Sequence, residues 1–319
     1  MSILVTGGAG FIGSHVLDRL VARPPRAGEP IVALDNFDNF YPEPVKRANI
    51  AGAIAHGVQL VEGDIRDAGL CRALFERHRF RAVIHLAARA GVRPSIEQPE
   101  LYEQVNCGGT VHLLEAARRA GGVERFIFGS SSSVYGITGR VPFSEDDPVA
   151  QPISPYAATK RAGELLCHVY NHLYGLPIVC LRFFTVYGPR QRPDLAIHKF
   201  TKLIDAGRPI PLFGDGSTSR DYTHVSDIVD GVMAALERPL GFEVINLGNS
   251  EPCELRELVR LIEGSLGKKA RVERLPMQPG DMPVTCADIS KARRLLGYAP
   301  RFPIGQGIAE FVEWFKDAR

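Results

Sequence analysis

The stretch SPYAATKRAGELL, residues 154–166, places a tyrosine and a lysine four residues apart. Ser154 is a favourable N-cap and Pro155 suits the first helical position, so we predict that a helix begins here. Tyr156 and Lys160 would then share one face of that helix. A phenol is a poor base at pH 7, but a neighbouring ammonium favours the phenolate, which could exchange a proton with an alcohol. Taken alone, so common a spacing is more often structural.

Four consecutive serines, in FGSSSSVYG at residues 128–136, follow the apolar stretch RFIF. If RFIF is a strand of a parallel sheet, the serines lie at its carboxyl edge, where α/β proteins bind ligands. A serine hydroxyl there could hydrogen-bond the alcohol that Tyr156 deprotonates and then the ketone that forms. A serine-rich turn alone would be a polar loop, but with Tyr156 and Lys160 it completes a set of residues suited to hydride transfer.

The stretch ILVTGGAGFIG, residues 3–13, provides a site for the hydride carrier. A predicted strand leads into Gly7, Gly10 and Gly13 and a predicted helix follows, which is the context of a dinucleotide-binding turn. The helix N-terminus would hold the phosphates. The alternative is a glycine-rich turn without a ligand, which the acidic residue at the end of the next predicted strand disfavours.

That acid is Asp35, the last residue of IVALD. A carboxylate there accepts hydrogen bonds from the adenosine ribose and repels a 2′-phosphate, so we predict NAD rather than NADP as the cofactor. Asp64 ends the following predicted strand. Two interpretations stay open for it: a contact to the edge of the adenine, or the N-cap of the next helix.

Apolar stretches of strand length alternate along the chain with helical patterns. The candidate strands are ILV, IVALD, VQLVEGD (58–64), AVIHLAA (82–88), RFIFGSS and PIVCLRFF (177–184). Near-continuous apolar strands separated by helices indicate the α/β class, with a doubly wound parallel sheet covered on both faces. Pro and Gly become more frequent after about residue 184. We therefore predict a sheet domain at 1–183, to which 224–248 returns, and a smaller C-terminal α/β domain at 184–319.

The composition excludes several classes of protein. The 319 residues are 45% hydrophobic, and 38 Lys and Arg nearly balance 36 Asp and Glu, so we do not expect nucleic acid as a partner. No apolar run is long enough for a membrane span. The six cysteines form no C-x-x-C pair, which favours reduced thiols in the cytoplasm. His168 and His172 lack a third ligand, so we predict no metal site.

Five motifs, TGGAGFIG, HLAA, SSSSVYG, YAATK and RDYTHVSD, together resemble the extended short-chain dehydrogenase/reductases, and among them the NAD-dependent nucleotide-sugar epimerases and dehydratases. They occur in family order over nearly the whole chain. The resemblance implies a Rossmann domain with tightly bound NAD, a C-terminal domain that binds a nucleotide diphosphate sugar, and a homodimer. By position it makes Ser131 the hydroxyl partner, Tyr156 the acid/base, and Lys160 the residue that lowers the tyrosine's pKa and holds the nicotinamide ribose.

The same resemblance adds contact residues. Arg220 matches the family's diphosphate contact, and GDMP, residues 280–283, resembles its closing loop, with Gln278 where many relatives have Arg. The predicted cofactor contacts, besides Tyr156 and Lys160, are Gly7, Gly10, Phe11, Ile12, Gly13, Asp35, Asn36, Asp64, Ile65, Leu86, Ala87 and Ala88. The predicted substrate contacts are Arg93, Ser131, Ser132, Ser133, Thr185, Arg192, Arg220 and Asp281.

Ser132 and Ser133 narrow the choice of reaction. The family's 4,6-dehydratases have an Asp-Glu pair at these positions, and its UDP-glucuronate decarboxylases have a Glu. Hydroxyls cannot replace the additional acid and base that elimination requires, so dehydration is disfavoured. Epimerisation at C4, which needs only Tyr156 and NAD, stays open.

The stretch FFTVYGPRQRPDLAIHKF, residues 183–200, resembles the corresponding segment of the UDP-glucuronate 4-epimerases, with Thr185 where galactose-type epimerases have Asn. Arg220 and helix amides already serve the diphosphate, so Arg192 is assigned to a second anion, the C6 carboxylate of a uronic acid. A solvated loop arginine and a substitute diphosphate ligand are the alternatives for Arg192. We expect Arg190 to be solvent-exposed.

The predicted function is the reversible C4 epimerisation of UDP-glucuronate to UDP-galacturonate through a 4-keto intermediate. Within enzymes, the alternatives are a 4-epimerase of UDP-glucose or UDP-N-acetylglucosamine and a UDP-glucuronate decarboxylase. Outside them, the fold could serve a non-catalytic NAD-dependent regulator. Loss of Tyr156 or Lys160 would have favoured a regulator, and both residues are present.

Overall fold

The computed structural model describes residues 1–22, 29–137, 139–276 and 282–318. The chain divides into two compact units, and the boundary between them falls inside two elements, α9 (Val225–Glu237) and β10 (Phe242–Leu247). The first unit comprises Met1–Ile137, Glu145–Phe183 and Val229–Ile245, and the second comprises Thr138–Ser144, Phe184–Ile228 and Asn246–Arg319.

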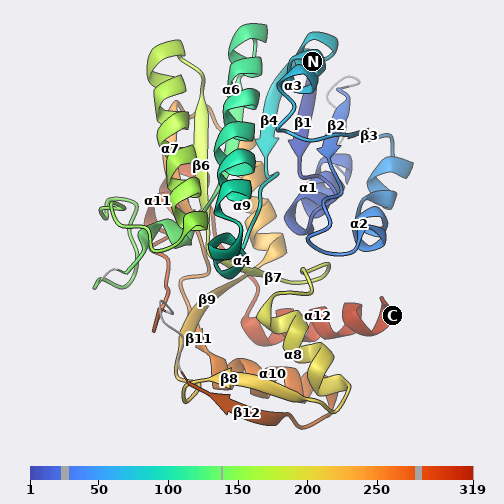
Figure 1. Ribbon diagram of the computed structural model, residues 1–319, viewed down its shortest axis with the longest axis vertical. Helices are drawn as coiled ribbons and strands as arrows, with labels where there is room; N and C mark the ends of the chain where they lie inside the picture. The colour runs from blue at the N-terminus through green and yellow to red at the C-terminus, as the bar shows by residue number, and fades with distance from the viewer. Residues whose placement is uncertain (23–28, 138, 277–281, 319) are drawn as a thin grey trace. The chain divides into compact units, whose positions relative to one another are not determined.

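The first unit alternates strands and helices along the chain (Figure 1). Its elements are β1 (Ser2–Thr6), α1 (Phe11–Ala22), β2 (Ile31–Asp35), α2 (Glu43–Ala55), β3 (Gln59–Glu62), α3 (Ala68–Arg77), β4 (Phe80–His85), α4 (Val92–Glu97), α5 (Pro99–Glu103), the π-helix η1 (Gln104–Gly108), α6 (Gly109–Ala120), β5 (Arg125–Ser131), the 3-10 helix η2 (Ser132–Tyr135), α7 (Pro155–Tyr174) and β6 (Ile178–Phe183).

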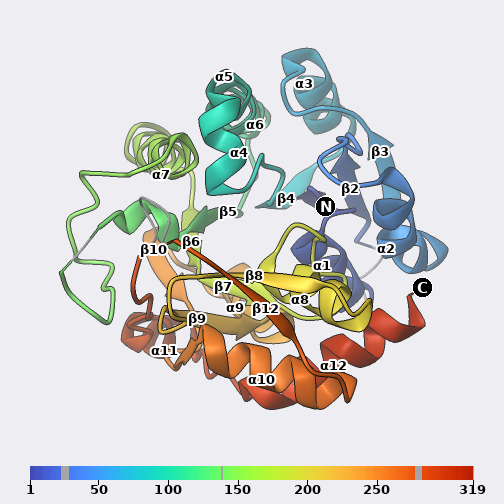
Figure 2. The ribbon, with the colours of Figure 1, turned by 60° about the horizontal axis from the view of Figure 1, so that its bottom comes forward.

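A seven-stranded sheet forms the centre of this unit, in the order β10-β6-β5-β4-β1-β2-β3. The pairings among β1 to β6 are parallel. Helices α3, α6 and α7 pack in a row on one side of the sheet, whereas α1 and α2 pack together on the other side (Figure 2). The predicted α/β class with a doubly wound parallel sheet is confirmed, and the strand order reverses between β1 and β4, the point where such sheets bind ligands.

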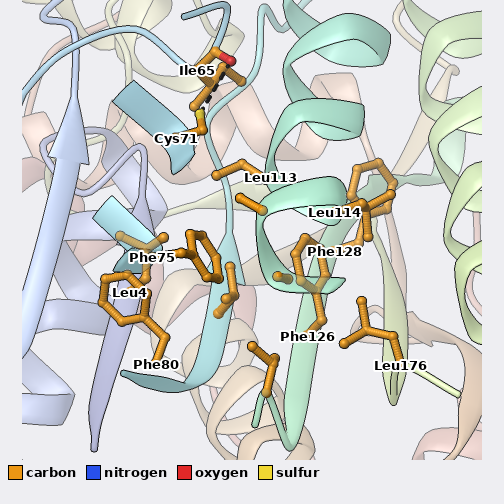
Figure 3. Close-up of a cluster of buried hydrophobic side chains, with 14 of the residues drawn as sticks. Leu4, Ile65, Cys71, Phe75, Phe80, Leu113, Leu114, Phe126, Phe128 and Leu176 are labelled. Carbon is orange, nitrogen blue, oxygen red and sulfur yellow. Dashed lines mark hydrogen bonds between the residues drawn. The ribbon is translucent and has the colours of Figure 1, made fainter. Parts of the chain in front are cut away.

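The core of the first unit lies between β1, β4, β5 and the row of helices α3, α6 and α7 (Figure 3). Aromatic rings from two strands, Phe80, Phe126 and Phe128, meet Phe75 of α3 and Leu113 of α6 there. Each of these side chains is fully or almost fully buried. Their packing holds the helices at fixed positions over the strand ends that carry the candidate site.

The second unit has two small sheets and a separate core. Its elements are β7 (Thr185–Tyr187), α8 (Ala196–Asp205), β8 (Pro209–Phe213), β9 (Ser219–His224), β11 (Pro252–Glu254), α10 (Leu255–Leu266), β12 (Arg271–Leu275), α11 (Ser290–Leu296) and α12 (Ile304–Asp317). Strand β9 pairs with β7 in parallel and with β11 antiparallel, while β8 pairs with β12. Helices α8, α10 and α12 enclose the core of this unit.

The predicted domain limits differ from the observed units at three short stretches, 139–144, 224–228 and 246–248, all of which group with the second unit. The prediction placed them in the sheet domain. For 139–144 the backbone of Phe143 explains the difference, because its N–H donates to the carbonyl of Cys286 at 2.8 Å and its carbonyl accepts from the N–H of Asp288 at 2.9 Å. A prediction from composition alone could not find this backbone pairing over a long sequence separation.

Gly163 tests the packing of α7 on β5. A Cβ at Gly163 would lie 2.3 Å from Cζ of the buried Phe128. We therefore expect Gly163→Ala to lower the free energy of unfolding by about 1–3 kcal/mol, measured by urea denaturation. Gly52 of α2 is the matched control, because a Cβ there meets nothing within 4 Å. Gly52→Ala should raise the stability by roughly 0.5–1 kcal/mol, and equal effects of the two substitutions would contradict the packing argument.

Candidate active site

The glycine-rich turn after β1 leaves no room for side chains. Gly7 has φ +71°, and a Cβ on it would lie 2.7 Å from the backbone nitrogen of Ala87. A Cβ on Gly13 would lie only 2.0 Å from the carbonyl oxygen of Gly7. Helix α1 begins at Phe11, so the first-turn amides, including those of Phe11 and Ile12, are not used within the helix. The turn therefore presents bare backbone and a helix N-terminus, which fits a diphosphate.

The carboxyl ends of β1 and β4 are joined by a buried polar network at the point where the strand order reverses. Thr6 Oγ1 lies 2.7 Å from His85 Nδ1 and accepts a hydrogen bond from the N–H of Ala87 at 3.2 Å, and His85 Nε2 lies 3.0 Å from Thr110 Oγ1. Burial, together with the charge of Lys160, lowers the pKa of His85 to about 3, so this imidazole is neutral at pH 7. The network fixes the backbone from which Leu86, Ala87 and Ala88 follow.

Asp35, at the end of β2, connects the loop that follows it to the glycine-rich turn. Its carboxylate accepts hydrogen bonds from the backbone N–H of Ala9 at 3.0 Å and of Phe37 at 2.9 Å. Burial raises the pKa of Asp35, and these two hydrogen bonds oppose that rise. A carboxylate has about four lone-pair sites, so two bonds leave acceptor capacity for ribose hydroxyls.

Asp64 lies beside Asn36, whose side-chain amide donates to it at 2.8 Å. Burial acts to raise the pKa of Asp64, but hydrogen bonds from the Arg66 side chain and backbone outweigh it, and the pKa falls to about 2. The N-cap of α3 is Asp67, which accepts from the N–H of Leu70 at 3.0 Å. The interpretation of Asp64 as that N-cap is therefore wrong, while its predicted contact with adenine stays a prediction, as does that of the buried Ile65.

Helix α7 begins as the sequence predicts. The side chain of Ser154 accepts a hydrogen bond from the N–H of Ala157 at 3.1 Å, and Pro155 occupies the first helical position. The ring of Tyr156, near the start of the helix, packs edge-on to Tyr102 of α5 with 6.2 Å between ring centroids. Because Ser154 is buried, this capping hydrogen bond is shielded from water and holds the first turn of α7, which contains Tyr156, in place.

Lys160 lies one turn further along α7 and is only 5% exposed. Its ammonium donates to the carbonyl oxygen of Gly129 on β5 at 2.7 Å and lies 5.1 Å from the centroid of the Phe128 ring. Burial lowers the pKa of Lys160 to about 8, although Cys107, Cys167 and Glu164 act to raise it. The ammonium form thus predominates at pH 7, held two residues before Ser131 on the same strand.

The four serines lie at the end of β5 and the start of η2. Ser131 is 8% exposed, and its hydroxyl accepts a hydrogen bond from the N–H of Ser133 at 3.2 Å, which caps η2. Ser132 and Ser133 are half-buried. The helix that carries Tyr156 and Lys160 therefore packs on the strand that ends at Ser131.

A buried ion pair that the sequence analysis missed lies beneath these residues. Glu164 of α7 accepts from Ser130 Oγ at 2.7 Å, and its two oxygens pair with Arg182 of β6 at 2.8 and 2.9 Å. Arg161 adds a bond at 3.0 Å. The side chains of Glu164 and Arg182 are 1% and 2% exposed. A signal was available, because an arginine inside the apolar strand PIVCLRFF requires a buried partner.

The other predicted substrate residues fall on different units. Arg93 is exposed on α4 of the first unit, and Thr185 is half-buried at the start of β7 in the second. Arg220 of β9 is half-buried, and its Nη1 donates to the carbonyl oxygens of Ser219 at 3.0 Å and Met282 at 2.6 Å. Asp281 and Gln278 lie outside the described residues.

Arg192 already binds a carboxylate within its own loop. Its Nε and Nη2 donate to the two oxygens of Asp194 at 3.0 and 2.9 Å. The Asp194 side chain is 41% exposed and that of Arg192 is 17% exposed. Arg190 is half-buried with φ +63°, so the expectation that it is solvent-exposed holds only in part. Arg192 thus directs two donors of its guanidinium at one carboxylate.

A model described as the NAD dependent epimerase/dehydratase family matches residues 3–248. The chain belongs to this family. UDP-glucuronate 4-epimerase 4 of Arabidopsis thaliana is 44% identical over 99% of the chain and 75% of its own length. UDP-glucuronate 4-epimerase of Thermodesulfobacterium geofontis is 42% identical over 98% of the chain and 96% of its length.

Solved structures of other epimerases share the fold. UDP-glucuronic acid 4-epimerase from Bacillus cereus, in complex with UDP-glucuronic acid and NAD, has a TM-score of 0.92 at 39% identity, with all of both chains covered. UDP-glucose 4-epimerase from Thermotoga maritima, with UDP-glucose, has a TM-score of 0.90 at 32% identity, covering 100% of this chain and 99% of that one.

The first unit fits the NAD of this epimerase/dehydratase family. In the turn at Gly7, Gly10 and Gly13 the backbone is bare and could approach the diphosphate closely. Asp35 ends the adjacent strand. Within the described ranges, no group of three or more His, Cys, Asp or Glu side chains could hold a metal ion. Nor is any helix in those ranges both long enough and apolar enough to cross a membrane.

Glu164 tests the ion pair beneath the site. Glu164→Gln leaves the buried guanidinium of Arg182 without a counter-charge, so we expect the free energy of unfolding to fall by about 3–5 kcal/mol in urea denaturation. Replacing both partners, by Glu164→Met with Arg182→Met, should recover most of that loss. Glu115→Gln is the control, because the half-exposed Glu115 pairs with Arg118 and Arg119, and it should cost less than about 1 kcal/mol. Similar losses for Glu164→Gln and Glu115→Gln would show that burial does not set the cost.

Proposed function

We infer that this protein catalyses the reversible C4 epimerisation of UDP-glucuronate to UDP-galacturonate. The observation that carries this inference is the packing of α7, which bears Tyr156 and Lys160, on β5, which ends at Ser131, in a chain 42–44% identical to UDP-glucuronate 4-epimerases. Ser132 and Ser133 follow Ser131, so the extra acid and base of a dehydratase are lacking at those positions.

The protein residues handle the proton of the C4 hydroxyl. Bound NAD supplies a hydride acceptor and donor for the C4 carbon. Tyr156 takes the proton as the alcohol becomes a 4-ketone and returns it when the ketone is reduced on its other face. Ser131 hydrogen-bonds the same oxygen, and the ammonium of Lys160 favours the phenolate form of Tyr156. The sugar must turn over in the site between the two steps.

We assign the C6 carboxylate of the uronic acid to Arg192, assisted by Thr185. The support is the forked geometry that Arg192 shows toward Asp194, which matches any carboxylate. A 4-ketone next to this carboxylate is a β-keto acid, which loses carbon dioxide when the carboxylate bond aligns with the carbonyl π system. An arginine that holds the carboxylate out of this alignment would suppress decarboxylation, so Arg192 has a geometric role as well as a binding role.

We propose that Arg220 contacts the diphosphate of the UDP-sugar, with further substrate contacts from Arg93, Ser132, Ser133 and Asp281. Support for Arg220 comes from its hydrogen bond to the backbone carbonyl of Met282, which belongs to GDMP, the stretch that resembles the family's closing loop. Arg220 is half-buried, so a phosphate that it binds would be partly shielded from water.

A 4-epimerase of neutral UDP-sugars is the second candidate. UDP-glucose 4-epimerase from Thermotoga maritima has the same fold, so the fold alone does not decide between a uronic acid and a neutral sugar. A UDP-glucuronate decarboxylase is the third, and the serines at 132 and 133 disfavour it. The choice between these candidates therefore rests on the carboxylate contact.

The test is incubation of the purified protein with UDP-glucuronate, without added NAD, followed by proton NMR of the sugar products. UDP-galacturonate should appear until equilibrium is reached, and Tyr156→Phe should abolish its formation. UDP-xylose as the main product would instead identify a decarboxylase. Turnover of UDP-glucose or UDP-N-acetylglucosamine, with none of UDP-glucuronate, would refute the uronic acid assignment.

Arg192 has a separate prediction. Arg192→Met should raise the KM for UDP-glucuronate roughly tenfold or more, because a charge-assisted hydrogen bond is lost, and should increase the fraction of decarboxylated product seen by NMR. Arg190→Met in the same loop is the control and should change neither quantity. If Arg192→Met weakened the binding of UDP-glucuronate and UDP-glucose equally, the carboxylate assignment would be wrong.

We also propose a homodimer in the cytoplasm. The six cysteines are unpaired, which suits a reducing compartment. An exposed apolar stripe on α7, formed by Leu165, Val169 and Leu173, is 43–61% exposed and repeats every four residues, as a helix face buried against a second copy would.

The oligomeric state tests the stripe. Leu165→Glu combined with Leu173→Glu should convert the protein from twice the mass of one chain to a single chain, measured by light scattering during size-exclusion chromatography. Ile54→Glu, at a 40% exposed position on α2, should leave the mass unchanged. A wild-type protein that elutes as one chain would overturn the proposed dimer.

A further inference from the structure

Arg89 joins two loops that follow different strands of the first unit. Its Nη1 donates to Oδ1 of Asp38 in the loop after β2, and its Nη2 donates to Gln98 Oε1 at 3.3 Å. Its guanidinium also lies over the Phe40 ring, 4.9 Å from the centroid. Arg89 is 8% exposed and the side chain of Asp38 is 28% exposed, so the arginine end of this ion pair is buried.

Both ends of this contact are anchored. Asp38 accepts from the N–H of Phe40 at 2.9 Å, and the ammonium of Lys46 donates to the Asp38 carbonyl oxygen. On the other side, the amide side chain of Asn106 accepts from the N–H of Arg89 at 2.8 Å and donates to its carbonyl oxygen at 3.0 Å. The Arg89–Asp38 bond therefore connects two rigid segments.

The order of the strands places this bond across the cofactor region. Strand β1 lies between β2 and β4 in the sheet, and the glycine-rich turn follows β1. A bond between the loops after β2 and β4 must therefore span the end of β1. Predicted cofactor contacts lie on both sides of this bond. Asp35 and Asn36 lie where β2 ends, and Leu86, Ala87 and Ala88 follow β4.

One donor of Arg89 has no acceptor among the residues that the structure describes. This donor is Nε, which is buried. A buried donor left without a partner costs roughly 1–3 kcal/mol, whereas an oxygen of a bound dinucleotide would satisfy it. This nitrogen therefore points to a ligand on the buried side of the contact.

We propose that Arg89 and Asp38 form a clasp that retains the dinucleotide, in which Arg89 is also a direct cofactor contact. An enzyme that oxidises and then reduces the same carbon returns its cofactor unchanged, so nothing is gained by exchanging it between turnovers. This reason for retention rests on the proposed epimerase function. The clasp itself rests on the contacts of Arg89 and is measured by cofactor release, without any UDP-sugar.

The experiment measures cofactor release from the purified holoenzyme. Bound NAD is replaced by radiolabelled NAD, and loss of the label is followed after an excess of unlabelled NAD is added. Arg89→Met should release NAD about tenfold faster or more, and should retain less NAD per chain through purification, because a desolvated charged contact is removed. Arg89→Lys keeps the charge but loses the forked geometry, so its release rate should be intermediate.

Arg47→Met is the matched control. Arg47 stacks on Phe37 in the same loop at 4.1 Å, but its ion pairs are with Glu43 and Glu62, and its side chain is 45% exposed. Arg47→Met should release NAD at the wild-type rate. Release as fast as that of Arg89→Met would show that general order in the loop, and not the clasp, retains the cofactor.

A double-mutant cycle tests whether Arg89 and Asp38 act as a pair. Asp38→Asn alone should speed release, but should add little in the Arg89→Met background, because the contact is already lost. Independent effects of the two substitutions, or wild-type release from Arg89→Met, would overturn the proposal. Unfolding of each variant in saturating NAD identifies any that fail to fold, in which case Arg89→Lys carries the test. Wild-type protein that retains NAD but does not convert UDP-glucuronate would count against the proposed function and leave the clasp intact.

Discussion

The position of α7, the helix that carries Tyr156 and Lys160, depends on the hydrogen bonds of the Glu164 carboxylate. This carboxylate joins α7 to β6 through Arg182 and to β5 through the hydroxyl of Ser130, the residue before Ser131. Removing two charges from water is unfavourable, and a well-packed apolar pair could be equally stable. An apolar pair, however, would not fix the orientation of the helix on the sheet, because apolar contacts have no preferred direction. The two hydrogen bonds between Glu164 and Arg182 do. The pair therefore sets how α7, with Tyr156 and Lys160, lies against the strand that carries the serines.

The conformation of the glycine-rich turn after β1 depends on a different constraint, the lack of space for side chains. Gly7 and Gly13 allow the glycine-rich turn to touch the backbone at Ala87 and α1 to begin close to β1. Because backbone groups meet there, the N–H of Ala87 donates to the side chain of Thr6, which in turn lies against the neutral His85. The turn after β1 thus leaves bare backbone where we expect the diphosphate of NAD, whereas β5 and α7 carry the hydroxyls and the ammonium that we propose for the reaction.

The sequence predicted what depends on local patterns and missed what depends on long-range pairing. The α/β class, the N-cap Ser154 and the spacing of Tyr156 and Lys160 follow from periodicity and capping, which act within a few residues. The N-cap interpretation of Asp64 was wrong because Asp67, three residues further along the chain, caps α3 instead. Contacts between distant residues, such as Glu164 with Arg182, leave only an indirect signal, a charge inside an apolar element.

Two arginine–carboxylate pairs have similar geometry but differ in burial, and burial decides whether the carboxylate could be replaced by that of a ligand. Arg182 and Glu164 are almost fully buried, so either partner alone would be an uncompensated charge, and the pair is permanent. Arg192 and Asp194 have the same forked contact at a site where Asp194 is 41% exposed. An exposed pair contributes about 0–1 kcal/mol, so a substrate carboxylate could replace Asp194 at little cost. On the proposed assignment, Asp194 pairs with Arg192 until the uronic acid binds. A neutral sugar has no carboxylate that could replace Asp194.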